Sequence, residues 1–280
     1  MLKTLTLALL AVAVAALGSG DERSDADKMA EQHRHDKPSA TPAAMAAPAQ
    51  AVTGEEVVYG QVGGKPVHGF LARPQAAKGP LPGLIVIHEW WGLNDNIRSM
   101  AKRLAGEGYA ALAVDLYGGQ TADNPDRAKE LMGAAMGNTA ANLENLRQAY
   151  DYLKTQQKAP KVGVIGWCFG GGWSLQTALL LPDRIAATVI YYGRLETDKA
   201  KLAPLKMPVI GFFGGKDQGI TPASVREFEK AMKELGKNVE VHIYENANHA
   251  FANPSGGNYD AAAAKDAWER TTKFLAKNLK

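Results

Sequence analysis

The sequence predicts an α/β fold in a single domain, with a mostly parallel sheet of about eight strands flanked by helices. From Thr53 onward, short continuous apolar runs alternate with segments of helical period, as expected for strands buried on both faces and their crossover helices. The hydrophobic fraction of 46% and charged fraction of 22% are those of a globular protein, so a sizeable core can form. No internal repeat is visible, and a second domain is not required for 280 residues.

The expected elements follow in order along the chain. An opening antiparallel pair covers 56–59 and 65–72 around Gly63-Gly64, and further strands are expected at 83–88, 109–114, 162–166, 186–191, 208–213 and 239–244. Helices are expected at 95–107, at 124–157 in two pieces broken around Gly137-Asn138, and at 169–181, 221–236 and 258–278.

The segment before this domain has two parts. Residues 1–20 combine a basic start, an apolar stretch and a small-residue exit, which predicts an export signal and a periplasmic protein without a stable membrane anchor after cleavage. Residues 21–52 have the Pro- and Ala-rich composition of a disordered tether, which leaves 53–280 as the folded domain. His33 and His35 flank Arg34 in this tether, and we expect them to be solvated.

Charge and cysteine content exclude several classes of site. The formal net charge is +3 and no long basic run occurs, so the sequence does not indicate a nucleic-acid-binding protein. Cys168 is the single cysteine, which rules out an intrachain disulfide and a multi-cysteine metal site. The residues therefore indicate no metal site, and they predict no particular oligomeric state.

The run from Lys161 to Gly172 carries the main chemical signal. A buried strand ends at Gly166, Cys168 follows two residues later, and glycines occupy 170–172 before a helical segment. This is the strand, turn and helix of a nucleophile elbow with cysteine in the serine position. The turn places the thiol at a helix N-terminus, where the thiolate is favoured. The alternative is that Cys168 is a small core residue.

A cysteine nucleophile needs a base and a group that orients the base. In this topology an acid and then a histidine follow the nucleophile, each after a strand. Asp217 follows the expected strand at 208–213, and His249 follows the strand at 239–244. Either residue alone could be a turn or surface residue, but their order and context predict a Cys-His-Asp triad.

Several separate motifs give the chain a resemblance to a known family. The motifs are G-W-C-F-G-G at 166–171, H-E-W-W-G-L-N at 88–94, Asp115-Leu116-Tyr117, Tyr191-Tyr192-Gly193, Asp217 and His249-Ala250-Phe251. Together they resemble the dienelactone hydrolase, or carboxymethylenebutenolidase, family over about residues 55–278. The resemblance implies the α/β-hydrolase fold and hydrolysis of a lactone by Cys168, His249 and Asp217 without a cofactor.

The resemblance also implies roles for residues around the nucleophile. Glu89 corresponds to the glutamate that keeps the resting thiol neutral and takes its proton when substrate binds. A tetrahedral intermediate needs two donors to its oxyanion, and the N–H after the nucleophile, at Phe169, is the first. The resemblance places the second donor at the backbone N–H of Trp90.

Departures from the family pattern restrict the expected substrate. An arginine that holds the substrate carboxylate belongs four residues after the histidine, where this chain has Asn253. Arg127 is a loose match to a second arginine, and Arg194 could supply a cation from another direction or lie on the surface. Trp91, Tyr191 and Tyr192 predict an aromatic substrate pocket, although part of this set could pack in the core.

These observations predict a hydrolase that cleaves a lactone or carboxylic ester through a thioacyl-enzyme. A general carboxylesterase or thioesterase is the main alternative within hydrolases. A non-catalytic binding protein on the same fold is a second alternative, which the intact triad argues against. Thiol redox work through Cys168 is a third, and it is weakened because the chain has no resolving cysteine.

Overall fold

The computed structural model describes residues 31, 33, 34, 38 and 46–280. The expected export signal and most of the tether lie outside the described residues. The strands form one eight-stranded sheet in the order β1-β2-β4-β3-β5-β6-β7-β8. They are β1 (Val52–Val62), β2 (Lys65–Pro74), β3 (Gly83–Ile87), β4 (Ala110–Val114), β5 (Val162–Trp167), β6 (Ile185–Tyr191), β7 (Val209–Gly214) and β8 (Val239–Tyr244). The single-domain α/β prediction is therefore confirmed.

The described helices lie between these strands along the chain, except α8, which follows the last strand. They are α2 (Asp95–Gly106), α3 (Pro125–Met136), α4 (Thr139–Thr155), α5 (Phe169–Leu180), α6 (Lys199–Leu202), α7 (Pro222–Glu234) and α8 (Ala261–Leu279). The expected break between two helical pieces falls at Gly137 and Asn138, between α3 and α4. Helix α6 was not predicted, because its four residues bury only Leu202 and show no apolar period.

The first two strands differ from the rest in direction. β1 pairs antiparallel with β2, and β2 pairs antiparallel with β4. From β4 through β3 to β8 every neighbouring pair is parallel. β1 begins four residues before the predicted 56–59, since its early residues pair with the end of β2 while their side chains stay largely exposed. Such an edge strand has no continuous apolar run to mark it.

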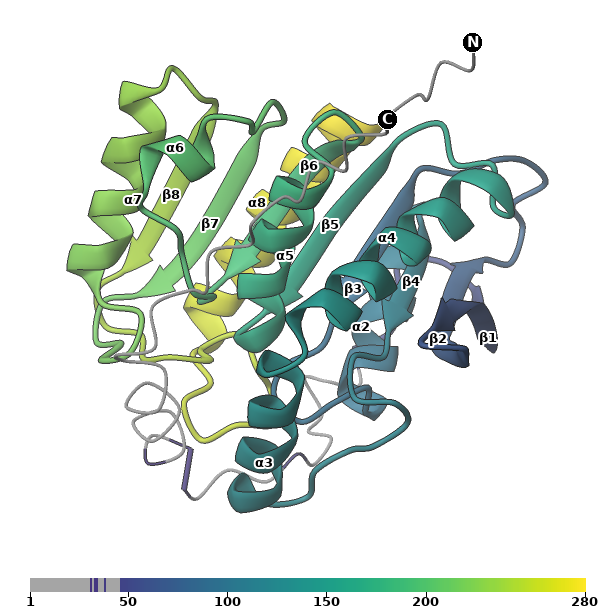
Figure 1. Ribbon diagram of the computed structural model, residues 1–280, viewed down its shortest axis with the longest axis horizontal. Helices are drawn as coiled ribbons and strands as arrows, with labels where there is room; N and C mark the ends of the chain where they lie inside the picture. The colour runs from purple at the N-terminus through teal and green to yellow at the C-terminus, as the bar shows by residue number, and fades with distance from the viewer. Residues whose placement is uncertain (1–30, 32, 35–37, 39–45) are drawn as a thin grey trace, which may run out of the picture.

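Helices cover both faces of the sheet. α4 and α5 lie on the front face in Figure 1, and α8 lies behind the sheet. The central strands β3, β4 and β5 are buried along their whole length, as continuous apolar runs predict. Because β3 and β5 to β8 run parallel, their carboxyl ends all lie on the same side of the sheet, and the loops that follow them meet there.

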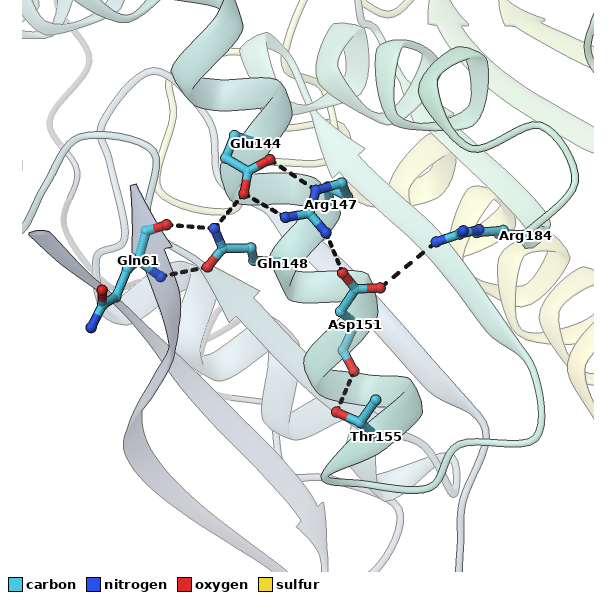
Figure 2. Close-up of polar contacts among 7 residues, drawn as sticks. All are labelled: Gln61, Glu144, Arg147, Gln148, Asp151, Thr155 and Arg184. Atoms are coloured by element: carbon cyan, nitrogen blue, oxygen red, sulfur yellow. Dashed lines mark hydrogen bonds and ion pairs between the residues drawn. The ribbon is translucent and has the colours of Figure 1, made fainter. Parts of the chain in front are cut away.

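Polar side chains of α4 link this helix to the edge strand β1. Gln148 bonds to both the backbone N–H and the backbone carbonyl of Gln61, and Arg147 pairs with Glu144 and Asp151 (Figure 2). Hydrogen bonds from Arg147 and Gln148 lower the pKa of Glu144 to about 2. These groups are solvent-accessible, so the ion pairs add little stability. The backbone bonds of Gln148 tie α4 to β1, which its pairing with β2 holds in the sheet.

Candidate functional site

The predicted elbow is present between β5 and α5. Cys168 has φ of 54° and ψ of −117°, a strained backbone conformation that places its side chain at the start of α5. The strain persists because the turn is packed against neighbouring backbone on both sides. A Cβ atom at Gly170 would lie 2.3 Å from the carbonyl oxygen of Ile87, and one at Gly166 would lie 2.2 Å from that of Gly170. Glycine is therefore required at both positions.

The structure brings Cys168, His249 and Asp217 together. His249 Nε2 lies 3.2 Å from Cys168 Sγ, and His249 Nδ1 lies 2.6 Å from Asp217 Oδ2. The other carboxylate oxygen of Asp217 accepts hydrogen bonds of 2.9 Å from the backbone N–H groups of Gly219 and Ile220. The three side chains are almost fully buried, with exposed fractions of 3% for Cys168, 3% for Asp217 and 2% for His249.

Charge within this buried group sets the protonation of His249. Burial alone would lower the pKa of His249, but the negative charge of Asp217, the electrostatic interaction with Cys168 and the hydrogen bonds to both side chains raise it well above its usual value. Burial would likewise raise the pKa of Asp217, yet His249 and the N–H groups of Ile220 and Gly219 hold it below the usual value. The arrangement therefore favours a proton on the imidazole while Asp217 stays ionised.

Glu89 lies beside this group in a cage of neutral donors. The Tyr192 hydroxyl donates to Glu89 Oε1 over 3.3 Å, and Asn253 Nδ2 donates to Oε2 over 2.6 Å. Glu89 is 3% exposed. Burial and the charges of Glu89 and Cys168 raise the pKa of Tyr192 well above its usual value, so Tyr192 remains a donor.

The small cavity next to Glu89 contains no cationic side chain. It is lined by Glu89, Asn96, Ile97, Met100, Trp167, Tyr192, Ala252, Asn253 and Pro254. Each of these residues is described by the structure, and none is Lys, Arg or His. The position at which the family resemblance implies a carboxylate-binding arginine is thus filled by an amide that binds Glu89 instead.

His88 joins the two loops next to the nucleophile, a role that the sequence analysis did not assign. Its Nε2 accepts a 3.2 Å hydrogen bond from the Leu116 N–H, so Nδ1 carries the proton and donates to the Glu89 carbonyl over 2.6 Å. Burial lowers the pKa of His88, which keeps the ring neutral in this bridge. A histidine at the end of a fully apolar strand was the signal available in the sequence.

Both residues predicted to supply oxyanion donors lie next to the elbow. Phe169 is the first residue of α5, and its N–H has no acceptor one turn earlier within the helix. Trp90 follows Glu89 in the loop after β3, and its ring is buried 4.9 Å from the ring of Trp91. The Gly170 contact with the Ile87 and His88 carbonyls holds this loop against the elbow.

Of the remaining substrate-binding candidates, some lie at the site and one lies in the core. Tyr192 and Asn253 reach Glu89, and Trp91 packs on Trp90. Tyr191 instead points toward α8, where its hydroxyl lies 2.7 Å from Thr271 Oγ1, so it belongs to the core. Tyr191 is the last residue of β6, whereas Tyr192 follows the strand with a left-handed φ of 35°, so the two side chains leave the backbone in different directions.

The two arginine candidates lie on other surfaces. Arg127 is half-exposed on α3, where it pairs with Glu130 over 2.5 Å and bonds to Gln120. Arg194 is exposed after Gly193, and its backbone lies beside α5 at Gly172. Neither lines the cavity beside Glu89.

The expectation that His33 is solvated is wrong. This side chain is 2% exposed, and its ring lies 5.3 Å from the ring of Trp90 and 5.4 Å from that of His249. Aromatic packing against the site explains the burial. His35 lies outside the described residues. In the described part of the chain, no three His, Cys, Asp or Glu side chains gather as metal ligands. Nor does any helix there combine the length and apolar character needed to span a bilayer.

Comparisons with known proteins agree on one family. The family model of the dienelactone hydrolase family matches residues 67–279. Protein usf of Aquifex pyrophilus is 36% identical over 231 residues, which cover 80% of this chain and 99% of that protein. A Saccharolobus solfataricus protein named "Putative carboxymethylenebutenolidase" is 33% identical over 258 residues and covers 79% of this chain and 97% of its own length.

A solved structure supports the same assignment. The crystal structure of a dienelactone hydrolase-like promiscuous phosphotriesterase from metagenomic libraries has a TM-score of 0.75 and 26% sequence identity. The match covers 82% of this chain and 100% of that one. The predicted resemblance and the α/β-hydrolase fold are therefore confirmed.

Replacing the buried carboxylate tests the charge balance at His249. We expect Asp217→Asn to lower the pKa of His249, because the amide keeps the shape but removes the negative charge that favours the imidazolium. Turnover should fall by roughly 10⁴-fold. NMR titration of His249 in a Cys168→Ala background measures the pKa without the thiolate. An unchanged His249 pKa would show that Asp217 does not control this group.

The elbow glycine provides a test of the packing. Gly170→Ala should destabilise the protein by about 2–3 kcal/mol, because the new methyl group meets backbone oxygens that cannot move aside. Gly133→Ala in α3 is the control, since no atom lies within 4 Å of the added carbon. The control should gain about 0.5–1 kcal/mol from helix propensity. Equal unfolding free energies for the two variants would contradict this account.

Proposed function

The chain belongs to the dienelactone hydrolase family and is a hydrolase, and on this premise we propose that it cleaves a lactone or carboxylic ester through a Cys-His-Asp triad. In this proposal Cys168 is the nucleophile, His249 the general base and acid, and Asp217 the orienting carboxylate. The observation that carries it is the continuous chain of contacts from Cys168 Sγ through His249 to Asp217 at a strained elbow.

The contacts support a two-step reaction. Glu89 takes the thiol proton of Cys168, and the sulfur attacks the carbonyl carbon to form a tetrahedral oxyanion. The oxyanion collapses to a thioester as the C–O bond breaks, and the protonated His249 gives its proton to the departing alkoxide. The neutral His249 then takes a proton from water, the hydroxide attacks the thioester, the acid leaves as the C–S bond breaks, and Glu89 returns its proton to the sulfur.

The oxyanion formed in both steps needs donors that are already in place. In the proposal these are the backbone N–H groups of Phe169 and Trp90, which the Gly170 contact holds close together. Asp217 stays ionised throughout and stabilises the imidazolium by charge and hydrogen bonding.

Glu89 is proposed to control the proton of the resting thiol. Tyr192 and Asn253 are both neutral, so the hydrogen bonds that they donate to the carboxylate orient it without compensating its charge. A carboxylate that is released when substrate arrives can accept the thiol proton, so the nucleophile forms only at that moment. A thiol that is neutral at rest is also less open to oxidation.

The surroundings of Glu89 favour uncharged substrates. Asn253 binds Glu89 where the family resemblance implies an arginine, and the described residues that line the small cavity there include no Lys, Arg or His to hold a substrate carboxylate. This observation supports the second candidate, a general carboxylesterase or thioesterase, over an enzyme for anionic lactones. Turnover of a neutral enol-lactone, its carboxylated analogue and a simple aryl ester, measured side by side, separates the candidates.

Removal of the nucleophile tests the proposed triad. Cys168→Ala should lower kcat for every active substrate by about 10⁴-fold or more while leaving circular dichroism and melting temperature nearly unchanged. His249→Ala should lower kcat by a similar factor, and it should also lower the melting temperature because Asp217 is left buried without its partner. His242→Ala on β8 is the matched control, because His242 pairs with Glu240 away from the elbow and should keep wild-type turnover. Wild-type rates in the Cys168→Ala variant would refute the assignment of the nucleophile.

Neutralising the caged carboxylate tests its role with the thiol. Glu89→Gln should lower kcat by roughly 10²-fold with a smaller change in KM, because the variant keeps the shape but cannot accept the thiol proton. The exposed Glu227→Gln on α7 is the control and should not change either constant. If Glu89→Gln turns over substrate at the wild-type rate, Glu89 takes no part in activating the thiol.

A further inference from the structure

Two buried tyrosines flank β4, and both hydroxyl groups are unsatisfied. Tyr109 precedes the strand, and Tyr117 lies three residues after it, at the carboxyl-end edge of the sheet. Both side chains are buried, and neither hydroxyl oxygen has a hydrogen-bond partner among the described residues. A buried hydroxyl without a partner costs folding free energy, so its presence calls for an explanation.

The surroundings of Tyr117 place it at the proposed oxyanion site. Its ring lies 4.6 Å from the ring of His88 and 5.5 Å from that of Phe169. His88 precedes the loop that carries the Trp90 N–H, and Phe169 carries the other proposed donor. The ring of Tyr117 therefore packs against both segments that supply the backbone donors.

The backbone around Tyr117 is firmly held. The Tyr117 N–H donates to Asp115 Oδ1 over 2.8 Å, and the Gly119 N–H donates to the second carboxylate oxygen. The Asp115 carbonyl accepts a 2.9 Å hydrogen bond from Asn145 on α4. A donor on so constrained a loop needs little reorganisation when charge develops nearby.

Electrostatics keep the hydroxyl protonated. Burial raises the pKa of Tyr117 well above its usual value, and the charges of Cys168 and Asp115 raise it further. Tyr117 therefore remains a hydrogen-bond donor across the pH range in which an ester hydrolase works.

We propose that the Tyr117 hydroxyl is a third, catalytic donor to the substrate oxygen as it becomes the oxyanion, an inference that rests on the proposed function. Among the described residues the hydroxyl has no hydrogen-bond partner, and it gains one as negative charge forms on the substrate. Such an interaction is stronger in the transition state than in the ground state, so it raises kcat more than it lowers KM.

Tyr109 provides a matched control in the same chain. It has the same buried, unpartnered hydroxyl, but it lies at the opposite end of β4, where its ring is 5.0 Å from the ammonium nitrogen of Lys280. Removal of either hydroxyl breaks no hydrogen bond to a residue that the structure describes, so neither Tyr117→Phe nor Tyr109→Phe should lower the melting temperature.

Steady-state kinetics with a neutral aryl ester test the proposal. We expect Tyr117→Phe to lower kcat by about 10²-fold with KM within about twofold, as for other side-chain oxyanion donors. Tyr109→Phe should keep both constants. Wild-type kcat in Tyr117→Phe, with Cys168→Ala inactive, would overturn this inference alone. Hydrolysis by Cys168→Ala at the wild-type rate would instead overturn the proposed function on which it rests.

Alkylation of Cys168 by iodoacetamide separates an oxyanion donor from a group that stabilises the thiolate. In that reaction the sulfur displaces iodide from a methylene carbon and no carbonyl oxygen becomes an oxyanion. The pH profile of the alkylation rate in Tyr117→Phe should therefore match that of the wild type. A shift of this profile together with the loss of kcat would show that Tyr117 stabilises the thiolate, and it would overturn the proposed role. A melting temperature of Tyr117→Phe low enough to explain the loss of kcat by unfolding would also overturn it.

Discussion

The contact of Gly170 with the carboxyl end of β3 is the constraint on which the rest of the site depends. Backbone oxygens of Ile87 and His88 approach α5 so closely that no side chain fits between them. This contact holds the start of α5 against the loop after β3. It also keeps the Cys168 backbone in a strained conformation that an unfolded chain rarely adopts. The nucleophile and both proposed backbone donors are thereby fixed relative to one another before substrate binds.

Asp217 and His249 form a buried pair of charged side chains that stabilise each other. Asp217 and His249 are buried, and each is ionised more readily because the other is present. The backbone N–H groups of Gly219 and Ile220 complete the coordination of the carboxylate. A buried charge without these contacts would be costly, so the pair is stable only as a unit.

The cage around Glu89 shows how one side chain changes the electrostatics of the pocket. Asn253 donates a hydrogen bond to Glu89 as a cation would, but it adds no positive charge. The described lining of this cavity therefore carries net negative character from Glu89. A substrate with a negative charge would be repelled by Glu89, whose charge Asn253 does not compensate. Asn253 is therefore connected to the preference proposed for neutral esters.

The sequence by itself determined the order of strands and helices, the elbow at Cys168, and the order of the acid and the histidine. These features are local, because apolar periods, glycines and turns are determined by neighbours along the chain. Only the tertiary structure decided that Tyr192 faces Glu89 while Tyr191 faces α8, that His88 bridges two loops, and that the ring of His33 packs on His249. Those contacts join residues far apart in sequence, and their existence depends on strand register and on the twist of the sheet, which no short motif records.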